Sequence, residues 1–323
     1  MTSPVRIGIA GLGRMGRRHA ENIAHRVTGA KLAAACSPVV DELAWAKQTL
    51  GVAQTFTDYA TMLERADVDA VFLVTPTTMH AQQIVDALHA GKHVFSEKPL
   101  SLDLDQCLRV EREAASFPKL KVMIGFVRRF DASYQKMREK VTAGAIGKPL
   151  YVRSHTLDKH DPSGFFVRFA KTSGGIFLDM SVHDIDSARW LLGNPKPLRA
   201  FATGTVAIHE GLHQWQDVDN GAALVEFDGG KVASFVASRT MAHGFEALTE
   251  VVGTAGRLAV TTDEGTPTFY ERFADAFLRE DQAFVDVIVG DRAPPLTLHD
   301  ATEATRIGIA LRESLLGKRL VEL

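Results

Sequence analysis

The stretch Val5-Arg6-Ile7-Gly8-Ile9-Ala10-Gly11-Leu12-Gly13-Arg14-Met15-Gly16 decides the fold of the first part of this 323-residue chain. Residues 5–10 are mainly apolar and predict a buried β-strand, and residues 16–25 have the pattern of a helix. The three glycines between them have the G-x-G-x-x-G spacing of a dinucleotide-binding turn. Such glycines permit a tight turn and close approach of the backbone to a pyrophosphate, and the helix amino terminus offers N–H groups to the phosphates. We therefore interpret this turn as a dinucleotide site.

Strand and helix patterns continue to alternate as far as residue 125. Further strands are predicted at residues 32–35, 54–56, 70–74, 93–96 and 122–124. Helices are predicted at residues 41–50, 58–63 and 78–91 and from Asp103 onward, with Asp58 as an N-cap. This alternation is typical of an α/β Rossmann domain with a parallel, doubly wound sheet, which we assign to residues 1–125.

The pattern changes after residue 125. Residues 228–231 separate two apolar runs and predict a β-hairpin, and residues 251–258 predict a second one. Together with residues 150–154 and 198–206, they indicate a mainly antiparallel open sheet. Helices are predicted at residues 132–142, 177–192, 273–289 and 300–316. Residues 126–323 are therefore predicted to form an α+β domain.

The composition excludes several classes of protein. The formal net charge is −2 and the basic residues form only short groups, so we expect no nucleic-acid partner. Two cysteines imply no disulfide framework, and no apolar stretch is long enough to span a membrane. No signal-peptide pattern precedes the first strand, so we expect a cytoplasmic protein.

The end of the second strand bears on the choice of cofactor. A Rossmann domain that binds NAD usually has an acidic residue there, which grips the ribose hydroxyls, but this chain has Cys36-Ser37-Pro38. Ser37 can accept a ribose hydroxyl or tolerate a 2′-phosphate, and Arg14 can reach a 2′-phosphate or lie against the adenine. Asp41 and Glu42 follow instead of basic residues, which favours NAD. NADP remains an alternative.

Two further motifs carry candidate chemistry. Glu97-Lys98-Pro99 ends a predicted strand, and the proline disfavours a helical conformation at Lys98. Ligands bind outside the carboxyl ends of the strands in such a sheet, so Lys98 is placed to reach a cofactor and a substrate. If residues 177–192 are one helix, Asp179 and His183 lie on the same face, where a carboxylate can orient an imidazole for proton transfer. An ordinary helix with a solvated histidine is the alternative for His183.

These motifs occur in an order that resembles the Gfo/Idh/MocA oxidoreductases, and most closely their inositol dehydrogenase branch. The resemblance extends over essentially the whole chain. It is carried by the glycine turn, Glu97-Lys98-Pro99, the segment Gly125-Phe126-Val127-Arg128-Arg129-Phe130-Asp131 with Tyr134, and Asp179-x-x-x-His183. Ser37 departs from the family pattern, because many inositol dehydrogenases have an aspartate there.

The resemblance implies the roles of particular residues. Lys98 would bind between nicotinamide and substrate, and Asp179 and His183 would form the proton-transfer pair. The remaining cofactor-binding residues implied are Gly11, Gly13, Arg14, Met15, Gly16, Ser37, Thr75, Pro76, Thr77, His80 and Glu97. Arg128 and Asp158 would join Lys98, Asp179 and His183 in binding the substrate. The resemblance also implies a homo-oligomer, a dimer or tetramer, in which sheets pack face to face.

The residues and the resemblance together predict an NAD(P)-dependent dehydrogenase. It would oxidise a secondary alcohol of a cyclic polyol or sugar, with inositol as the best single candidate. His183 is the predicted general base and Lys98 the group that stabilises the developing alkoxide, while Lys98 as the base is the alternative. An aldose or amino-sugar dehydrogenase and a non-catalytic dinucleotide-binding regulator are the alternative functions.

One motif suggests a metal but is interpreted as a coincidence. His209-Glu210-Gly211-Leu212-His213 matches H-E-x-x-H, which binds zinc only when it lies on a helix. Here it contains a glycine and follows a strand-like run, so we predict a loop and no metal site. His155 and His160, on either side of Asp158, are also interpreted as solvated or pocket-edge residues.

Overall fold

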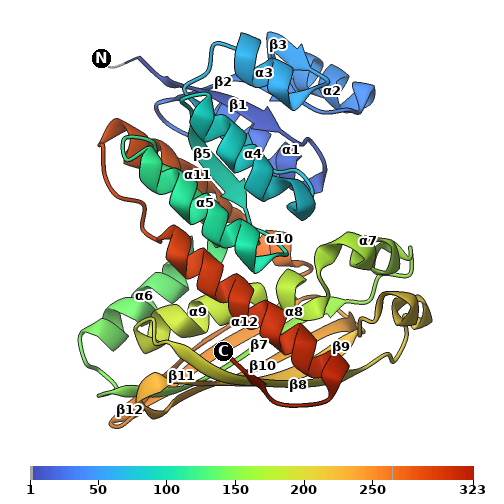
Figure 1. The fold of residues 1–323 in the computed structure, drawn as a ribbon, viewed down its shortest axis with the longest axis vertical. Coiled ribbons are helices and arrows are strands. Elements are labelled where there is room, and N and C mark those ends of the chain that lie inside the picture. Colours follow the sequence, from blue (N-terminus) through green and yellow to red (C-terminus); the bar gives the residue numbers. More distant parts are fainter. Residues whose placement is uncertain (1–2, 264) are drawn as a thin grey trace. The chain divides into compact units, whose positions relative to one another are not determined.

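A computed structural model describes residues 3–263 and 265–323, and it divides into two compact units (Figure 1). The first unit contains the chain up to Gly125 together with Phe277–Thr302. The second contains Phe126–Ala276 and Glu303–Leu323. The sequence analysis assigned every residue from 126 onward to the second domain, whereas Phe277–Thr302 clusters with the first unit.

The first unit is built on a parallel sheet. Within the described residues, six strands follow the order β3-β2-β1-β4-β5-β6. Every neighbouring pair is parallel. The strands are β1 (Val5–Ala10), β2 (Ala30–Cys36), β3 (Gln54–Phe56), β4 (Ala70–Leu73), β5 (His93–Glu97) and β6 (Val122–Gly125). This is the strand order of a dinucleotide-binding Rossmann fold, so the predicted fold class is confirmed.

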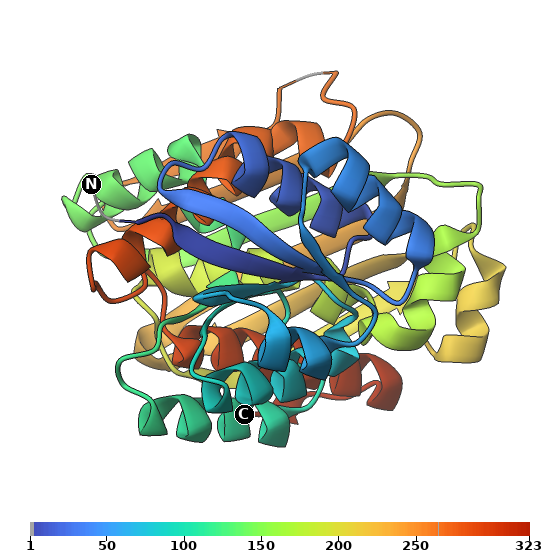
Figure 2. The ribbon, with the colours of Figure 1, turned by 90° about the horizontal axis from the view of Figure 1, so that it is seen from above.

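Helices cover both faces of this sheet. They are α1 (Arg14–His25), α2 (Val40–Leu50), α3 (Tyr59–Arg65), α4 (Thr77–His89) and α5 (Leu104–Ser116). Figure 2 shows α1 and α2, in dark blue, on one side of the strands and the teal helices α4 and α5 on the other. Helix α11 (Ala274–Val289) joins this unit from Phe277 onward, and its Phe284 ring packs edge-on against Phe72 at 5.4 Å.

Short polar side chains start two of these helices. Asp58 accepts a hydrogen bond from the backbone N–H of Thr61 at 2.8 Å, as its predicted N-cap role requires. Asp103 does the same for the N–H of Gln106 at 2.9 Å. Such caps satisfy backbone donors that have no partner within the first turn of a helix.

The second unit contains a mixed sheet that is mainly antiparallel. In the described part of the chain its strands follow the order β12-β11-β7-β10-β9-β8-β13. Only the pair β7 and β10 is parallel; the other five pairs are antiparallel. The strands are β7 (Pro149–Lys159), β8 (Pro197–Thr205), β9 (Asn220–Phe227), β10 (Lys231–Met241), β11 (Glu246–Gly253), β12 (Gly256–Thr261) and β13 (Val321–Glu322). The predicted α+β architecture and both predicted hairpins are confirmed.

Helices lie over one face of the second sheet (Figure 1). They include α6 (Ala132–Thr142), α8 (Ile176–Asp179), α9 (Val182–Leu192) and the part of α12 (Leu298–Gly317) from Glu303 onward. Two helices that the sequence analysis did not predict are α7 (Phe165–Ser173) and α10 (Phe269–Arg272). Among the described residues, no helix is both long enough and apolar enough to cross a membrane.

The other face of this sheet carries apolar side chains that remain exposed. Phe201 on β8 pairs across the sheet with Leu224 on β9, and Val236 on β10 pairs with Ala222, two residues from Leu224. Because side chains alternate between the faces of a strand, Phe201, Leu224 and Val236 share one face. Each of these three is more than 40% exposed.

The predicted single helix over residues 177–192 is wrong. The chain forms α8 and α9, separated by Met180 and Ser181. The Ile176 carbonyl accepts a bond from the N–H of Met180 at 2.9 Å and another from the N–H of Ser181 at 3.2 Å. The second bond spans five residues instead of four, so the turn is widened by one residue, as in the π-bulges that interrupt many helices.

Candidate active site

The glycine-rich turn connects β1 to α1, and each of its glycines has a different environment. Gly11 has a φ of 90°, and a side chain there would collide with the Val74 carbonyl. A side chain at Gly16 would collide with the carbonyl of Gly11. Gly13 is the N-cap of α1, and apart from its immediate neighbours in the chain no described residue places an atom within 4 Å of where its Cβ would be. The turn therefore packs tightly on two sides and leaves the helix amino terminus open, which fits a pyrophosphate.

The residues on either side of this opening differ in exposure. Arg14 is exposed at the first position of α1, and Met15 beside it is partly buried. Ser37, directly after β2, is 1% exposed, and its hydroxyl donates a hydrogen bond to Glu42 Oε2 at 2.5 Å. A carboxylate from the first turn of α2 is thus hydrogen-bonded to the residue that follows β2, where the sequence itself has no acid.

The segment after β4 contains Thr75-Pro76-Thr77 and is tied to the segment after β5. Buried His80 connects them, because its Nε2 lies 2.8 Å from the Thr75 carbonyl and its Nδ1 lies 2.9 Å from the Pro99 carbonyl. Burial lowers the pKa of His80. The Thr75 hydroxyl donates to Gln83 Oε1 at 2.5 Å. The side chain of His80 therefore holds two loops together, and its predicted contact with the cofactor stays a prediction.

Lys98 follows the last residue of β5, at the carboxyl edge of the parallel sheet. It is partly buried, and the Lys98–Pro99 peptide bond is cis. Its backbone N–H donates to Oε2 of Glu97 at 3.0 Å. The carboxylate of Glu97 therefore contacts the backbone of Lys98.

Glu97 is in turn part of a buried group of titratable side chains, which we call the His19 cluster: His19, Glu97, Glu280 and Asp281. Nε2 of His19 lies 3.1 Å from Glu97 Oε1, and its Nδ1 lies 2.6 Å from Asp281 Oδ1. The amide of Asn22 donates to the other oxygen of Asp281 at 2.9 Å. Burial alone would lower the pKa of His19, but the charges of Asp281 and Glu97 outweigh it and raise the pKa well above 6.5.

Glu280 lacks the partners that the other members of the cluster have. Both of its carboxyl oxygens are buried without a hydrogen-bond partner among the described residues. Burial raises its pKa well above 4.5, and the charge of Glu97 raises it further. A Cβ at Gly125 would lie 3.6 Å from Glu280 Oε1 and 3.5 Å from the carboxyl carbon of Glu97. Burial therefore favours the protonated form of Glu280, and a side chain at position 125 would be in contact with both carboxyl groups.

In the second unit, Asp179 is the last residue of α8, and a buried arginine holds its carboxylate. Nη2 of Arg239 donates to Asp179 Oδ2 at 2.6 Å, and the other side of the guanidinium lies 3.4 Å from Asp217 Oδ2. Asp217 Oδ1 accepts the N–H of Ile176 at 2.9 Å, at the start of α8. Arg239 and Asp217 thus fix both ends of this short helix.

His183 lies at the second position of α9, past the widened turn, and is 6% exposed. Its ring contacts two aromatic side chains, with ring-centre distances of 5.3 Å to Phe269 and 6.4 Å to Phe126. The ring is therefore held by apolar packing at a buried position. This is a suitable setting for a proton-transfer group, and the role stays a prediction.

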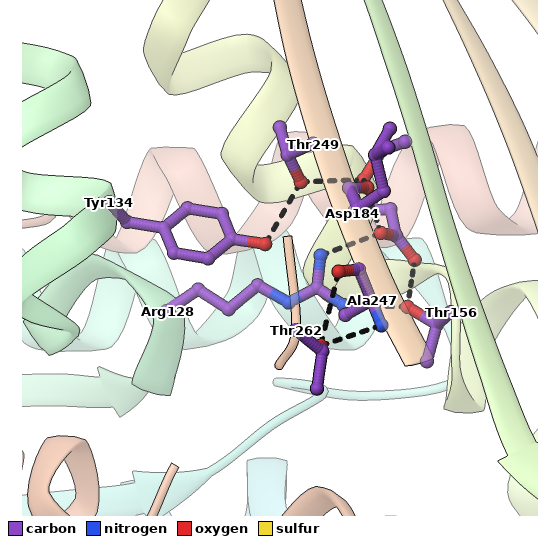
Figure 3. A network of polar contacts seen from close by, with 9 residues as sticks. Arg128, Tyr134, Thr156, Asp184, Ala247, Thr249 and Thr262 are labelled. Carbon is purple, nitrogen blue, oxygen red and sulfur yellow. Dashed lines mark hydrogen bonds and ion pairs between the residues drawn. The ribbon is translucent and has the colours of Figure 1, made fainter. Parts of the chain in front are cut away.

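Arg128 lies inside the second unit in a network of polar contacts (Figure 3). Arg128 is 1% exposed. Its guanidinium donates to Asp184 Oδ1 and to the Thr156 hydroxyl, both at 2.6 Å. Asp184 also accepts from the hydroxyl of Thr156 at 2.8 Å and from Ser154 at 2.5 Å. The Tyr134 hydroxyl joins the network through Thr249. The guanidinium is thus engaged by the protein itself, and the predicted contact of Arg128 with substrate stays a prediction.

The remaining candidates lie on strands and turns of the second unit. Asp158 is partly buried near the end of β7. The H-E-x-x-H motif is not a loop, as we predicted, but forms a 3₁₀ helix, Glu210–Trp215. His209 precedes this helix and is buried, whereas His213 is exposed beside Glu210. Among the described residues, no group of three or more His, Cys, Asp or Glu is placed to hold a metal ion.

Two models of known families match this chain. The model for an oxidoreductase family with an NAD-binding Rossmann fold matches residues 5–126. The model of the GFO/IDH/MocA C-terminal domain matches residues 134–259. The chain belongs to the Gfo/Idh/MocA oxidoreductase family. The family assignment made from the motifs is therefore confirmed. The prediction that the protein is an NAD-binding oxidoreductase is confirmed as well.

Relatives in this family are similar over nearly their full length. The NAD(+)-dependent scyllo-inositol 2-dehydrogenase of Bacillus subtilis is 35% identical, over 97% of this chain and 95% of that protein. The myo-inositol 2-dehydrogenase of Thermotoga maritima is also 35% identical, over 99% and 98%. The crystal structure of scyllo-inositol dehydrogenase from Lactobacillus casei, with bound NAD(H) and scyllo-inositol, is 40% identical, has a TM-score of 0.94 and covers 99% of both chains.

Proposed function

We propose that this member of the family oxidises a secondary alcohol of an inositol to the ketone and transfers the hydride to NAD⁺. The observation that carries the proposal is the similarity, over nearly the whole chain, to a dehydrogenase whose structure contains NAD(H) and scyllo-inositol. The environments of the three glycines in the first unit support it, because they leave an open helix terminus where a pyrophosphate fits.

When bound, the nicotinamide cofactor supplies the carbon that accepts the hydride. In the proposal, the Gly11–Gly16 turn holds the pyrophosphate, and Thr75, Pro76, Thr77 and His80 line the cofactor. The ammonium of Lys98 donates a hydrogen bond to the reacting oxygen and stabilises the negative charge that develops there. Glu97 orients this lysine through the backbone bond to Lys98.

We assign the proton-transfer step to Asp179 and His183. Nε2 or Nδ1 of a neutral His183 takes the proton from the alcohol, and Asp179 favours the charged imidazolium that results. Arg239 holds the Asp179 carboxylate in one orientation at 2.6 Å. Arg128 and Asp158 are proposed as further substrate-binding residues. Lys98 as the base is the alternative.

A panel of polyols tests this function directly. Purified protein is incubated with NAD⁺ and scyllo-inositol, myo-inositol or an aldose, and reduced nicotinamide is followed by its absorbance. We expect turnover of at least one inositol. Turnover of an aldose alone would assign a different substrate, and tight NAD⁺ binding without turnover of any polyol would favour a regulator.

A lysine variant tests the assignment of the site. We expect Lys98→Met to abolish turnover while cofactor affinity changes little, because the charge that stabilises the alkoxide is lost. Lys119→Met, which removes an exposed lysine of the same unit, is the matched control and should retain wild-type activity. Near-normal turnover in Lys98→Met would refute the role of Lys98.

We also propose that the protein forms a homo-oligomer through the open face of the second sheet. Exposed Phe201, Leu224 and Val236 on this face support the proposal, since contiguous exposed apolar side chains commonly mark an interface. Leu224→Lys should lower the mass measured by light scattering. A monomeric wild-type protein would rule it out. The cytoplasmic location stays a prediction.

A further inference from the structure

The end of β2 is built differently from that of a common NAD-binding domain. Ser37 occupies the position where an acid is usual, and both functions of its hydroxyl are in use. It donates to Glu42 Oε2 at 2.5 Å and accepts the backbone N–H of Val39 at 3.1 Å. The bond to Glu42 involves one carboxylate oxygen, and Glu42 is only partly buried. A carboxylate is thus fixed at the strand end although the strand itself does not supply it.

This carboxylate lies beside the strand end at which the adenosine ribose binds in Rossmann domains. The N–H of Gly11 donates to the carbonyl of Cys36 at 2.9 Å, so the glycine turn is hydrogen-bonded to the residue before Ser37. The acid that grips the ribose hydroxyls normally stands at the end of this second strand. Glu42 also lies in the first turn of α2, where the helix dipole favours a negative charge.

We infer that Glu42, oriented by Ser37, binds the ribose hydroxyls of NAD and excludes the 2′-phosphate of NADP. A carboxylate accepts hydrogen bonds from both ribose hydroxyls. In NADP one of these donors is replaced by a dianion, which Glu42 repels. Ser37 does not compensate, because its proton is already donated to Glu42. The inference rests on the proposed function only in requiring that the protein binds a nicotinamide dinucleotide.

Two arginines of α1, Arg14 and Arg17, are candidates for opposing this selection. The guanidinium of Arg17 lies 4.7 Å from the centre of the Trp45 ring on α2, so it is already engaged in a cation–π contact. Arg14 is exposed at the first position of the helix. If attraction of the 2′-phosphate by Arg14 outweighed its repulsion by Glu42, the wild-type protein would bind NADPH at least as tightly as NADH.

Binding measurements without substrate test the inference. Purified protein is titrated with NADH and with NADPH, nicotinamide fluorescence is recorded, and the ratio of the two dissociation constants is compared. We expect the wild type to prefer NADH, and Glu42→Gln to reduce the preference about tenfold or more, because it removes the charge and keeps the shape. Asp41→Asn is the matched control, since Asp41 is the exposed acid just before Glu42 in the same turn. It should leave the ratio nearly unchanged.

Ser37 is a positioning residue in this arrangement and needs its own readout. Ser37→Ala should lower the preference for NADH, and Ser37→Thr, which keeps a hydroxyl, should restore it. A merely structural role would weaken both nucleotides equally and leave the ratio unchanged, which would refute the role of Ser37.

Three results would overturn the inference as a whole. They are equal binding of NADH and NADPH by the wild type, an unchanged ratio in Glu42→Gln, and an equal loss of preference in Asp41→Asn. Because no substrate is present, selective binding of NADH without oxidation of any inositol would refute the proposed function and leave this inference standing.

Discussion

Replacing Glu280 with glutamine should change how the stability of the protein depends on pH. The Glu280 carboxyl is fully buried in the His19 cluster, and neither oxygen has a hydrogen-bond partner among the described residues. Burial raises its pKa well above 4.5, so the folded protein retains a proton that the unfolded chain releases. Glutamine has nearly the same shape and no proton to take up. The variant therefore isolates the contribution of this one ionisation.

The sign and size of the effect follow from proton linkage. A group whose pKa is raised on folding binds more protons in the folded state, so stability falls as pH rises from the unfolded pKa to the folded pKa. The slope is about 1.4 kcal/mol per pH unit for one proton. In the pH range between the unfolded pKa and the raised folded pKa, the wild type should lose stability relative to Glu280→Gln with this slope. Burying the glutamine amide of the variant can change its free energy of unfolding by the same amount at every pH, and such a change does not alter this slope.

The free energy of unfolding is measured by denaturant titration at several pH values, at one protein concentration, for the wild type and Glu280→Gln. Glu21→Gln is the control, because Glu21 is an exposed acid on α1 of the same unit. We expect the difference between wild type and Glu280→Gln to change steadily with pH and the difference for Glu21→Gln to stay flat. A flat difference for Glu280→Gln would mean that this carboxyl is not held protonated by burial.

Three further substitutions test other contacts. Arg239→Lys keeps the charge but loses the 2.6 Å bond to Asp179, and should lower kcat about tenfold while the melting temperature changes little; an unchanged kcat would contradict the positioning role. Arg128→Met leaves the buried charge of Asp184 uncompensated and should destabilise the protein by about 3–5 kcal/mol in denaturant unfolding, with partial recovery in Arg128→Met/Asp184→Asn. Gly125→Ala places a Cβ 3.0 Å from the ring of Phe95 and should cost about 1–3 kcal/mol, measured in the same way.

Much of the fold could be predicted because local patterns and local chemistry agree. The apolar strands of the first unit, their glycine turn and the aspartate caps are all short-range signals, and the structure has each of them. The Asp228–Gly230 turn predicts its hairpin for the same reason. The parallel pairing of β7 with β10 carries no local signal, because it joins segments separated by α7, α8 and α9.

The helix around Asp179 shows where periodicity fails. The spacing of Asp179 and His183 fits one continuous helix, but the carbonyl of Ile176 binds two N–H groups and widens the turn. What fixes the start of this turn is Asp217, which accepts the N–H of Ile176 from a distant part of the chain. The spacing of apolar residues along the sequence cannot predict this hydrogen bond between Asp217 and Ile176.

The acids of α11 were, in contrast, open to prediction. Phe277, Glu280, Asp281, Phe284 and Val285 are spaced three, four, seven and eight residues from the first, so they share one face of a helix, and all five are buried. A helix that puts two carboxyls on its apolar face requires a cation or protons, since an unpaired buried charge is very costly. The structure favours both solutions side by side: Asp281 lies 2.6 Å from the His19 ring, whose pKa is raised, and burial raises the pKa of Glu280, which favours its protonated form. Acids at core positions of an amphipathic helix therefore predict a buried titratable cluster, although the identity of the cationic partner comes only from the fold.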